Sequence, residues 1–366
     1  MIHSLDKNKK KDYTSSSNLS TLKKAKMAEI QKKEVFAMKY KTEVLTGIRA
    51  TGDLTVANYL GAVKPIVKLQ EQGVHPLVFV ADLHAITDKE PSEVKPYIHA
   101  VVADYLALGI DPQKTTIYIQ SDIAGEVLTL TALLARIISV AELLRVPTLK
   151  DKLRKNARPE TANAFLLLYP VMMAADILIN RARKVAVGED QLPHIEVTRE
   201  LARRFNKRYG EIFPIPQALT VRALRILSLK GEGKMSKTNP EGAIFLTDDA
   251  ATVARKIKAA ETAFEGVMNE KLESLVLIAH GLAKTEVEHN EVDALIEEHK
   301  RGKPVMGQFK QVLTRIVQNF LEEFQQRRAE ITRDPQYILS ILEEGRKIAQ
   351  QNAIETLTKV REVLQI

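Results

Sequence analysis

The amino-acid sequence predicts an α/β fold, a Rossmann-like doubly wound parallel sheet with a C-terminal all-helical domain. Between Thr42 and Asn206, short β-rich runs alternate with longer helical runs. After Asp248, apolar residues recur at helical spacing to the end of the chain. Alternating strands and helices require a parallel sheet with right-handed crossovers, whereas an apolar stripe at helical spacing is typical of amphipathic helices.

The expected elements follow in chain order. The predicted strands are Glu43–Ile48, Pro76–Ala81, Thr115–Ile119 and Lys184–Val187. The predicted helices are Val56–Gln72, Glu93–Leu108, Ala124–Leu144, Ala162–Asn180 and Gln191–Asn206, followed by helical stretches at Leu275–Leu282, Val312–Phe324 and Ile338–Leu364. The polar stretch Arg145–Glu160 is interpreted as a connecting insertion. We therefore predict a tail at 1–41, a sheet domain at 42–248 with an insertion near 145–160, and a helical domain at 249–366.

The composition excludes several kinds of site. The 366 residues include no cysteine, so disulfides and cysteine-ligated zinc or iron–sulfur sites are excluded, and a cytoplasmic location is expected. The longest apolar stretch, Ala164–Ala175, ends at Asp176. It is shorter than the ~20 residues that a membrane-spanning helix needs. We therefore expect no membrane partner.

Most of the positive charge lies in the tail. The formal net charge is +8. Residues 1–41 hold eleven lysines against four acidic residues, so 11 − 4 = +7 belongs to the tail and +1 to the rest of the chain. A lysine-rich polar segment has little capacity to form a core, and disorder is expected there. The overall charge therefore does not indicate nucleic-acid binding by the rest of the protein, which needs local basic patches.

Two segments have the composition of phosphate-binding loops. The first predicted strand leads into a turn at Gly52, and a helix opens after Thr55. In a doubly wound sheet this turn lies where phosphates meet free backbone N–H groups. The loop Gly233–Thr238 holds Lys234 and Lys237, whose ammonium groups can stabilise charge developing on pyrophosphate. Each segment alone also fits a simpler interpretation, a tight turn or a solvated basic loop.

Together the two segments resemble the paired motifs of class I aminoacyl-tRNA synthetases. Thr55-Val56-Ala57-Asn58 resembles the His-Ile-Gly-His motif in the Thr-Ile-Gly-Asn form of tryptophanyl enzymes, and Lys234–Thr238 resembles Lys-Met-Ser-Lys-Ser. Between them, Tyr169–Leu178 and Val187–Asn206 closely resemble tryptophanyl-tRNA synthetases and differ from tyrosyl enzymes. The resemblance runs from Glu43 to the end of the chain and is strongest from Tyr169 to Asn206.

The resemblance implies an ATP-dependent ligase that attaches L-tryptophan to tRNA(Trp) through a tryptophanyl adenylate. It also implies Mg²⁺ carried by ATP, no structural metal held by the protein, and a homodimer. Residues 42–248 would then be catalytic and 249–366 would bind the anticodon end of the tRNA, where Arg315, Arg327, Arg328 and Arg333 are available. Two alternatives stay open: a tyrosyl-tRNA synthetase, and a synthetase-like regulatory or RNA-binding paralogue with weakened catalysis.

The resemblance also assigns residues to the site. The implied catalytic residues are Lys155, Lys234 and Lys237. The implied ATP-binding residues are Arg49, Ala50, Thr51, Ala57, Asn58, Gly188, Glu189, Asp190, Ile226, Lys234, Met235, Ser236, Lys237 and Thr238. The implied tryptophan-binding residues are Leu45, Met173, Asp176, Val185, Val187 and Gln191. Asp176 stands on an apolar helix where its carboxylate needs a partner, and the resemblance makes that partner the indole N–H. His84 and His194 are expected to have structural roles.

The chain departs from the family pattern at five positions. Arg49 replaces glutamine, Ala50 proline, Ala57 glycine and Thr238 serine, and Leu45 stands where an aromatic residue often covers the indole. The Cβ of Ala57 is expected to crowd the adenine where glycine lets the base lie against the helix. A reduced affinity for ATP is therefore predicted.

Overall fold

The computed structural model describes residues 42–50, 52–156, 162–220 and 226–366. The predicted tail at 1–41, the predicted ATP-binding residue Thr51 and the side chain of the predicted catalytic residue Lys155 lie outside the described part. The other predicted site residues lie within it.

Five parallel strands form one sheet in the order β3-β2-β1-β4-β5. They are β1 (Thr42–Ile48), β2 (Leu77–Val80), β3 (Thr116–Ile119), β4 (Ala182–Val187) and β5 (Gln217–Thr220). The doubly wound prediction and its four strands are confirmed. Strand β5 was not predicted, because its sequence Gln-Ala-Leu-Thr has a single β-branched residue and no aromatic one. The strand order reverses between β1 and β4, which is where such sheets bind their ligands.

Helices connect the strands largely as predicted. They are α2 (Val56–Asn58), α3 (Lys64–Glu71), α4 (Asp82–Ala85), α5 (Pro91–Ala107), α6 (Ala124–Ala135), α7 (Val140–Leu143), α8 (Pro147–Asn156), α9 (Ala164–Ile179) and α10 (Leu192–Tyr209). A π-helical turn, Tyr59–Val63, joins α2 to α3. The prediction of one helix over Ala124–Leu144 is wrong. Helix α6 ends at Ala135. A new helix, α7, begins after Ser139, which forms a capping box with Glu142.

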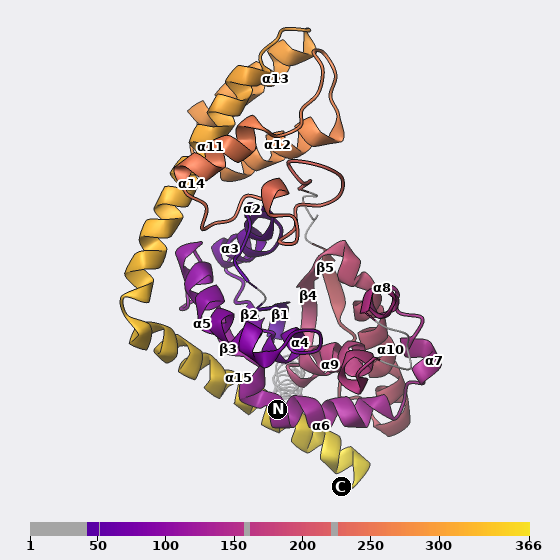
Figure 1. The fold of residues 1–366 in the computed structure, drawn as a ribbon. Helices are drawn as coiled ribbons and strands as arrows, with labels where there is room; N and C mark the ends of the chain where they lie inside the picture. Colours follow the sequence, from indigo (N-terminus) through magenta and orange to yellow (C-terminus); the bar gives the residue numbers. More distant parts are fainter. Residues whose placement is uncertain (1–41, 51, 157–161, 221–225) are drawn as a thin grey trace, which may run out of the picture.

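The helices cover both faces of the sheet (Figure 1). On one face, Leu45, Phe79 and Val185 belong to a buried cluster shared with α6, α9 and α10. On the other face, Val78 and Val80 belong to a second cluster, shared with α5 and with the helices after Asp248. Because successive side chains along a strand point to opposite faces, each strand contributes alternate residues to the two clusters.

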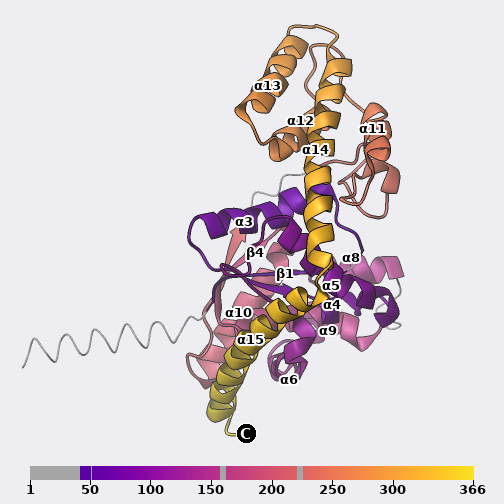
Figure 2. The same ribbon diagram turned by 90° about the vertical axis from the view of Figure 1, so that its left-hand side faces the viewer.

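The chain after Asp248 is helical within the described residues. Its helices are α11 (Ala250–Lys258), α12 (Glu270–Leu282), α13 (Glu286–Lys300), α14 (Met306–Thr332) and α15 (Pro335–Leu364). Helix α14 leads down from α11–α13, and α15 runs along the sheet region (Figures 1 and 2). At Gly345 of α15 a Cβ would lie 1.8 Å from the carbonyl oxygen of Ile117 in β3, so only glycine fits there. The last helix thus packs against the sheet, and the division into two domains stays a prediction.

Among the described residues, no helix is both long enough and apolar enough to cross a membrane.

Candidate active site

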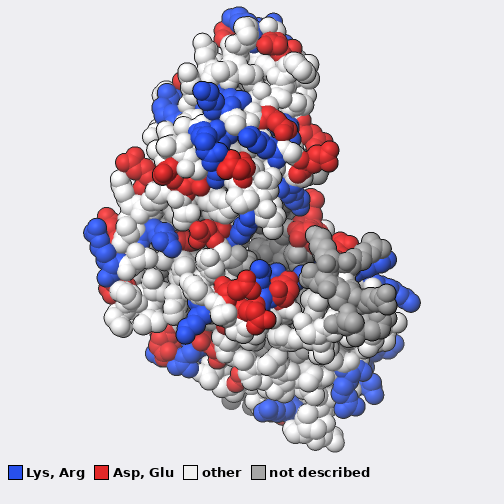
Figure 3. All heavy atoms as spheres, in the orientation of Figure 1, with Lys and Arg blue, Asp and Glu red and all other residues white. Residues whose placement is uncertain are grey.

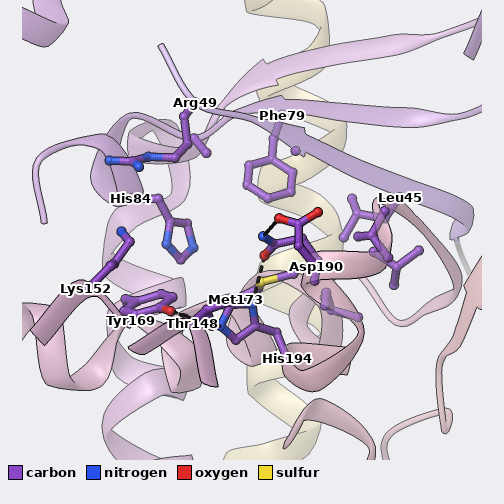
Figure 4. Close-up of a pocket in the computed structure, with 16 residues that line it drawn as sticks. Leu45, Arg49, Phe79, His84, Thr148, Lys152, Tyr169, Met173, Asp190 and His194 are labelled. Atoms are coloured by element: carbon purple, nitrogen blue, oxygen red, sulfur yellow. Dashed lines mark hydrogen bonds between the residues drawn. The ribbon is translucent and has the colours of Figure 1, made fainter. Parts of the chain in front are cut away.

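A cavity of about 450 Å³ lies at the carboxyl ends of β1 and β4 (Figure 4). Strands form one side of it, and α9 and the start of α10 form the other. Its lining residues are Leu45, Gly47, Arg49, Phe79, Ala81, His84, Thr148, Lys152, Tyr169, Met173, Ile177, Val185, Val187, Asp190, Gln191 and His194. The lining includes five of the six residues predicted to bind tryptophan, namely Leu45, Met173, Val185, Val187 and Gln191. Segments far apart in the sequence therefore converge on one largely apolar space.

Asp176, the sixth predicted residue, lies behind this cavity rather than in its lining. Its side chain is fully buried. Gln120 Nε2 donates to both carboxylate oxygens, at 2.9 and 2.8 Å, and His84 Nε2 donates to Oδ2 at 2.9 Å. Burial raises the pKa of Asp176, while the hydrogen bonds from His84 and Gln120 act in the opposite direction. Asp176 thus has protein partners that the sequence did not reveal, and one of them, His84, itself lines the cavity.

His194 forms the centre of a hydrogen-bonded chain along the cavity wall. Its Nδ1 lies 2.8 Å from Gln191 Oε1, and its Nε2 lies 2.6 Å from Thr148 Oγ1 and 3.0 Å from the Tyr169 hydroxyl oxygen. An amide oxygen only accepts, so Nδ1 carries the proton and Nε2 accepts from Thr148 Oγ1, to which the Tyr169 hydroxyl in turn donates at 3.0 Å. Burial, assisted by nearby His84 and Lys152, lowers the pKa of His194 to about 4. A neutral His194 therefore fixes the side-chain amide of Gln191.

Charged residues gather at the mouth of the cavity. Arg49 and Lys152 both contact the carboxylate of Asp88, with Lys152 Nζ 2.9 Å from Asp88 Oδ2. Burial raises the pKa of Asp88, but the two cations outweigh it and hold the pKa below its ordinary value. Lys152 Nζ also lies 4.8 Å from the centre of the Tyr169 ring. Sequence reasoning selected Lys155 of the same helix and missed Lys152, whose signal, one lysine among several in a polar stretch, is not distinctive.

The lysine loop lies against the first strand-to-helix turn. Lys237 Nζ donates to the carbonyl oxygen of Gly52 at 2.6 Å. Burial lowers the pKa of Lys237, and the carboxylates of Asp53 and Asp104 oppose this effect. Lys234 is exposed to solvent, and its backbone forms a bridge with Leu227. The two predicted phosphate-binding segments are therefore in direct contact.

A backbone hydrogen bond to the preceding segment holds the loop Gly233–Thr238. The N–H of Met235 donates to the carbonyl oxygen of Ile226 at 2.9 Å, so this Ile226 oxygen already has a partner. Ser236 Oγ and Thr238 Oγ1 lie 2.9 Å apart. Thr238 thus retains the hydroxyl that a serine offers at this position.

The helix start after Gly52 is capped by its own side chains. The N–H of Thr55 donates to Asn58 Oδ1 at 3.0 Å, and the N–H of Asn58 donates to Thr55 Oγ1 at 3.3 Å. Ala50 is buried, whereas Ala57 is partly buried and packs against the main core. The capping box fixes the direction in which α2 begins.

Acidic residues follow β4 at the same edge of the sheet. Gly188, Glu189 and Asp190 form the junction between β4 and α10, and Glu189 and Asp190 are exposed. A Cβ at Gly188 would lie 2.8 Å from Asp190 Oδ1. Gln191 Nε2 donates to Asp190 Oδ2 at 2.8 Å, which joins this junction to the His194 chain. Among the described residues no group of three or more histidine or acidic side chains is arranged to hold a metal ion.

The arginines predicted to contact tRNA are mostly engaged in ion pairs. Arg315 pairs with Glu291, Arg327 with Glu323, and Arg328 with the largely buried Asp104 of α5. On the face drawn in Figure 3, basic side chains gather over the α11–α12 end, with acidic side chains interspersed. The tRNA contact stays a prediction, and Arg328 has a structural partner that the sequence did not indicate.

The sequence was compared with protein families and with known proteins. Residues 38–322 match the family described as tRNA synthetases class I (W and Y). The chain is 36% identical over 329 residues to a tryptophan–tRNA ligase of Treponema pallidum, which covers 88% of this chain and 96% of that protein. For the Porphyromonas gingivalis tryptophan–tRNA ligase the identity is 37% over 330 residues, covering 88% of this chain and 98% of the relative.

Solved structures give the same picture. The tryptophanyl-tRNA synthetase of Campylobacter jejuni, complexed with ADP and tryptophan, has a TM-score of 0.75 at 32% identity, covering 88% of this chain and 100% of that chain. The tryptophanyl-tRNA synthetase of Mycoplasma pneumoniae has a TM-score of 0.78 at 32% identity, covering 89% of this chain and 98% of that chain. A tyrosyl-tRNA synthetase of Aeropyrum pernix, at 20% identity and a TM-score of 0.63, shares the fold alone.

Proposed function

Because the chain belongs to the class I tRNA synthetases for tryptophan and tyrosine, we propose that it is an aminoacyl-tRNA ligase that attaches L-tryptophan to tRNA(Trp). The observation that carries the proposal is the convergence of Leu45, Met173, Val185, Val187 and Gln191 on one cavity beside the nucleotide turn. A concave apolar space with a few fixed polar groups is typical of a small-molecule site.

The reaction proceeds in two steps. The carboxylate of tryptophan attacks the α-phosphorus of ATP, forming tryptophanyl adenylate and releasing pyrophosphate. A hydroxyl of the 3′-terminal ribose of the tRNA then attacks the carbonyl carbon of the adenylate, and AMP leaves. Neither step needs a nucleophile from the protein, so catalysis depends on alignment and on stabilising the charge of the phosphates.

The residues of the two motifs supply that charge stabilisation. Lys237 Nζ contacts Gly52, and Lys234 stands in the same loop with its side chain exposed to solvent, so both ammonium groups can reach a nucleotide bound at that turn. Lys152, at the cavity mouth, adds a third cation on the side of the connecting insertion. ATP brings its own Mg²⁺ as part of the substrate.

The amino acid is selected by the cavity. Oδ1 of Asp176 accepts from Gln120, which is the one donor to this oxygen among the described residues. A carboxylate oxygen has two lone pairs, so Oδ1 keeps a second acceptor position, but Asp176 is fully buried behind the cavity lining and the indole N–H reaches this position only if that lining shifts. A substrate that lacks this N–H leaves a buried acceptor position unpaired and therefore binds more weakly. An apolar pocket alone discriminates poorly between such substrates.

The remaining parts of the proposal concern partners and place. The helical region after Asp248 binds the anticodon end of the tRNA, and two copies of the chain form a homodimer. A cytoplasmic location follows from the role of charged tRNA in translation. ATP, tryptophan and tRNA are the substrates, and no membrane takes part.

Exchange of labelled pyrophosphate into ATP tests the first step. Tryptophan should support the exchange and tyrosine should not. Exchange with tyrosine instead would identify a tyrosyl enzyme, and absence of exchange with either amino acid would support a synthetase-like protein that does not catalyse.

A further inference from the structure

We infer that Phe79 is the aromatic wall of the amino-acid pocket and takes the place of the aromatic residue that is absent at Leu45. The inference rests on the proposed function, because it concerns how the same cavity holds tryptophan. Phe79 lies on β2, whereas Leu45 lies on β1. The ring is therefore delivered from the neighbouring strand.

The pairing of the two strands places the ring in this position. Leu45 is opposite Leu77, and Gly47 is opposite Phe79, so all four residues face the same side of the sheet. A Cβ at Gly47 would lie 2.4, 2.7 and 2.8 Å from Cζ, Cε1 and Cε2 of Phe79. The ring tip thus lies directly over the glycine, and any larger residue at position 47 would displace it.

The ring forms part of the cavity surface. Phe79 and Gly47 both line the cavity, together with Leu45 beside them (Figure 4). Met173 and Ile177 of α9 and Val185 of β4 complete the apolar part of the lining. Phe79 is 5% exposed, so most of the ring is buried and the exposed remainder belongs to the cavity side.

The ring is held from behind. The centres of the Phe79 and Tyr118 rings are 5.9 Å apart, and their planes are inclined by 32°. Tyr118 is fully buried, and its hydroxyl accepts a hydrogen bond from Asn180 Nδ2 at 3.0 Å. A ring supported in this way presents a fixed face to a ligand at little entropic cost.

An aromatic ring does more for an indole than an aliphatic side chain of similar size. Aromatic pairs gain energy from offset or edge-to-face arrangement of their quadrupoles in addition to area burial. Leu45 lacks such a ring, and among the described residues lining the apolar end of the cavity Phe79 is the one phenylalanine. Replacing the ring by an aliphatic group should therefore weaken tryptophan binding about three- to tenfold.

The test measures the affinity of tryptophan and of ATP by calorimetry for Phe79→Leu. The expected result is tryptophan binding weakened about three- to tenfold with ATP affinity within about twofold of the parent. Phe205→Leu is the matched control, since Phe205 is buried in the same core cluster but does not line the cavity. It should lose stability without changing the affinity for tryptophan. If Phe79→Leu does not fold, Phe79→Met replaces it.

A second variant exchanges the two side chains. Leu45→Phe combined with Phe79→Leu keeps the total volume and returns an aromatic ring to the pocket from β1. Recovery of tryptophan affinity to within about threefold of the parent is expected. The inference is overturned if Phe79→Leu binds tryptophan like the parent, if it weakens tryptophan and ATP equally, or if the exchange recovers nothing. If the parent protein itself binds no tryptophan, the proposed function fails instead.

Discussion

Lys237 Nζ donates a hydrogen bond of 2.6 Å to the carbonyl oxygen of Gly52, 185 residues earlier in the chain. Gly52 has a φ of 103°, a backbone conformation that favours glycine. The contact joins the lysine loop to the turn at the carboxyl end of β1. Two segments that are each inconspicuous in sequence are therefore in direct contact, as the proposed phosphate-binding site requires.

Removing the ammonium of Lys234 should slow the formation of the adenylate much more than it weakens tryptophan binding. Lys234→Ala is expected to lower the rate of pyrophosphate exchange about 100- to 1000-fold, because in the proposed mechanism the lysine stabilises charge that develops on the leaving phosphates. Stopped-flow or exchange kinetics and calorimetry with tryptophan give the two quantities. Lys230→Ala, an exposed lysine nearby, is the control. Equal losses in rate and in tryptophan affinity would contradict the assigned role.

Replacing Ala57 by glycine should tighten ATP binding. Ala57 lies in α2, between the two capping-box residues Thr55 and Asn58, and its Cβ is expected to crowd the adenine. Ala57→Gly should lower the Kd for ATP about two- to fivefold, although glycine in a helix costs about 0.5–1 kcal/mol of stability. Ala251→Gly in α11 has a similar stability cost on an exposed surface and should leave ATP binding unchanged. ATP binding no tighter than in the parent refutes the crowding explanation.

The buried imidazole of His194 should make the protein less stable in acid. Its pKa in the folded state is lowered to about 4, and in the unfolded chain it is near the ordinary value of 6.5. The unfolded state therefore binds more protons than the folded state between these two values, so the free energy of unfolding should fall as the pH falls through that interval, by roughly 3 kcal/mol in total. Urea unfolding of the parent and of His194→Gln as a function of pH measures this contribution.

The control for this experiment is His99→Gln, which changes an exposed histidine of α5. The slope of stability against pH should be reduced in His194→Gln and retained in His99→Gln. If both variants keep the slope of the parent, His194 is not the group responsible.

Arg328 should contribute to stability through Asp104. The guanidinium Nε lies 2.5 Å from Asp104 Oδ1, and the Asp104 side chain is 10% exposed. Burial raises the pKa of Asp104, although Arg328 and Lys237 act against it. Arg328→Met leaves a buried carboxylate unpaired and should cost about 2 kcal/mol in urea unfolding.

Two further variants make this prediction specific. Arg327→Met removes an exposed pair with Glu323 and should cost less than about 0.5 kcal/mol. Arg328→Met combined with Asp104→Leu removes both charges and should be more stable than Arg328→Met alone. Similar small losses for Arg327→Met and Arg328→Met would show that the contact between α14 and α5 contributes little.

The sequence predicted the features that depend on local pattern. Four strands, the long helices and the order of the two motifs follow from periodicity and from glycine and lysine positions. Strand β5 has too few characteristic residues, and the break after Ala135 depends on the cap formed by Ser139. Periodicity alone therefore detects neither strand β5 nor the end of helix α6.

The parts of the site that sequence did not predict depend on long-range partners. Lys152 contacts Asp88, 64 positions away, and His84 contacts Asp176, 92 positions away. Phe79 reaches the cavity because β2 pairs with β1 at Gly47. Register between strands and the positions of side-chain partners are properties of the folded chain, so the sequence did not indicate these contacts.

Aminoacylation is the reaction that the proposed function requires. The purified protein is incubated with a tRNA(Trp) transcript, ATP, Mg²⁺ and labelled tryptophan, and in parallel with labelled tyrosine and a tRNA(Tyr) transcript. We predict ATP-dependent transfer of tryptophan to tRNA(Trp) and no transfer of tyrosine. Transfer of tyrosine, or no charging of tRNA(Trp) with tryptophan under these conditions, would contradict the proposed function.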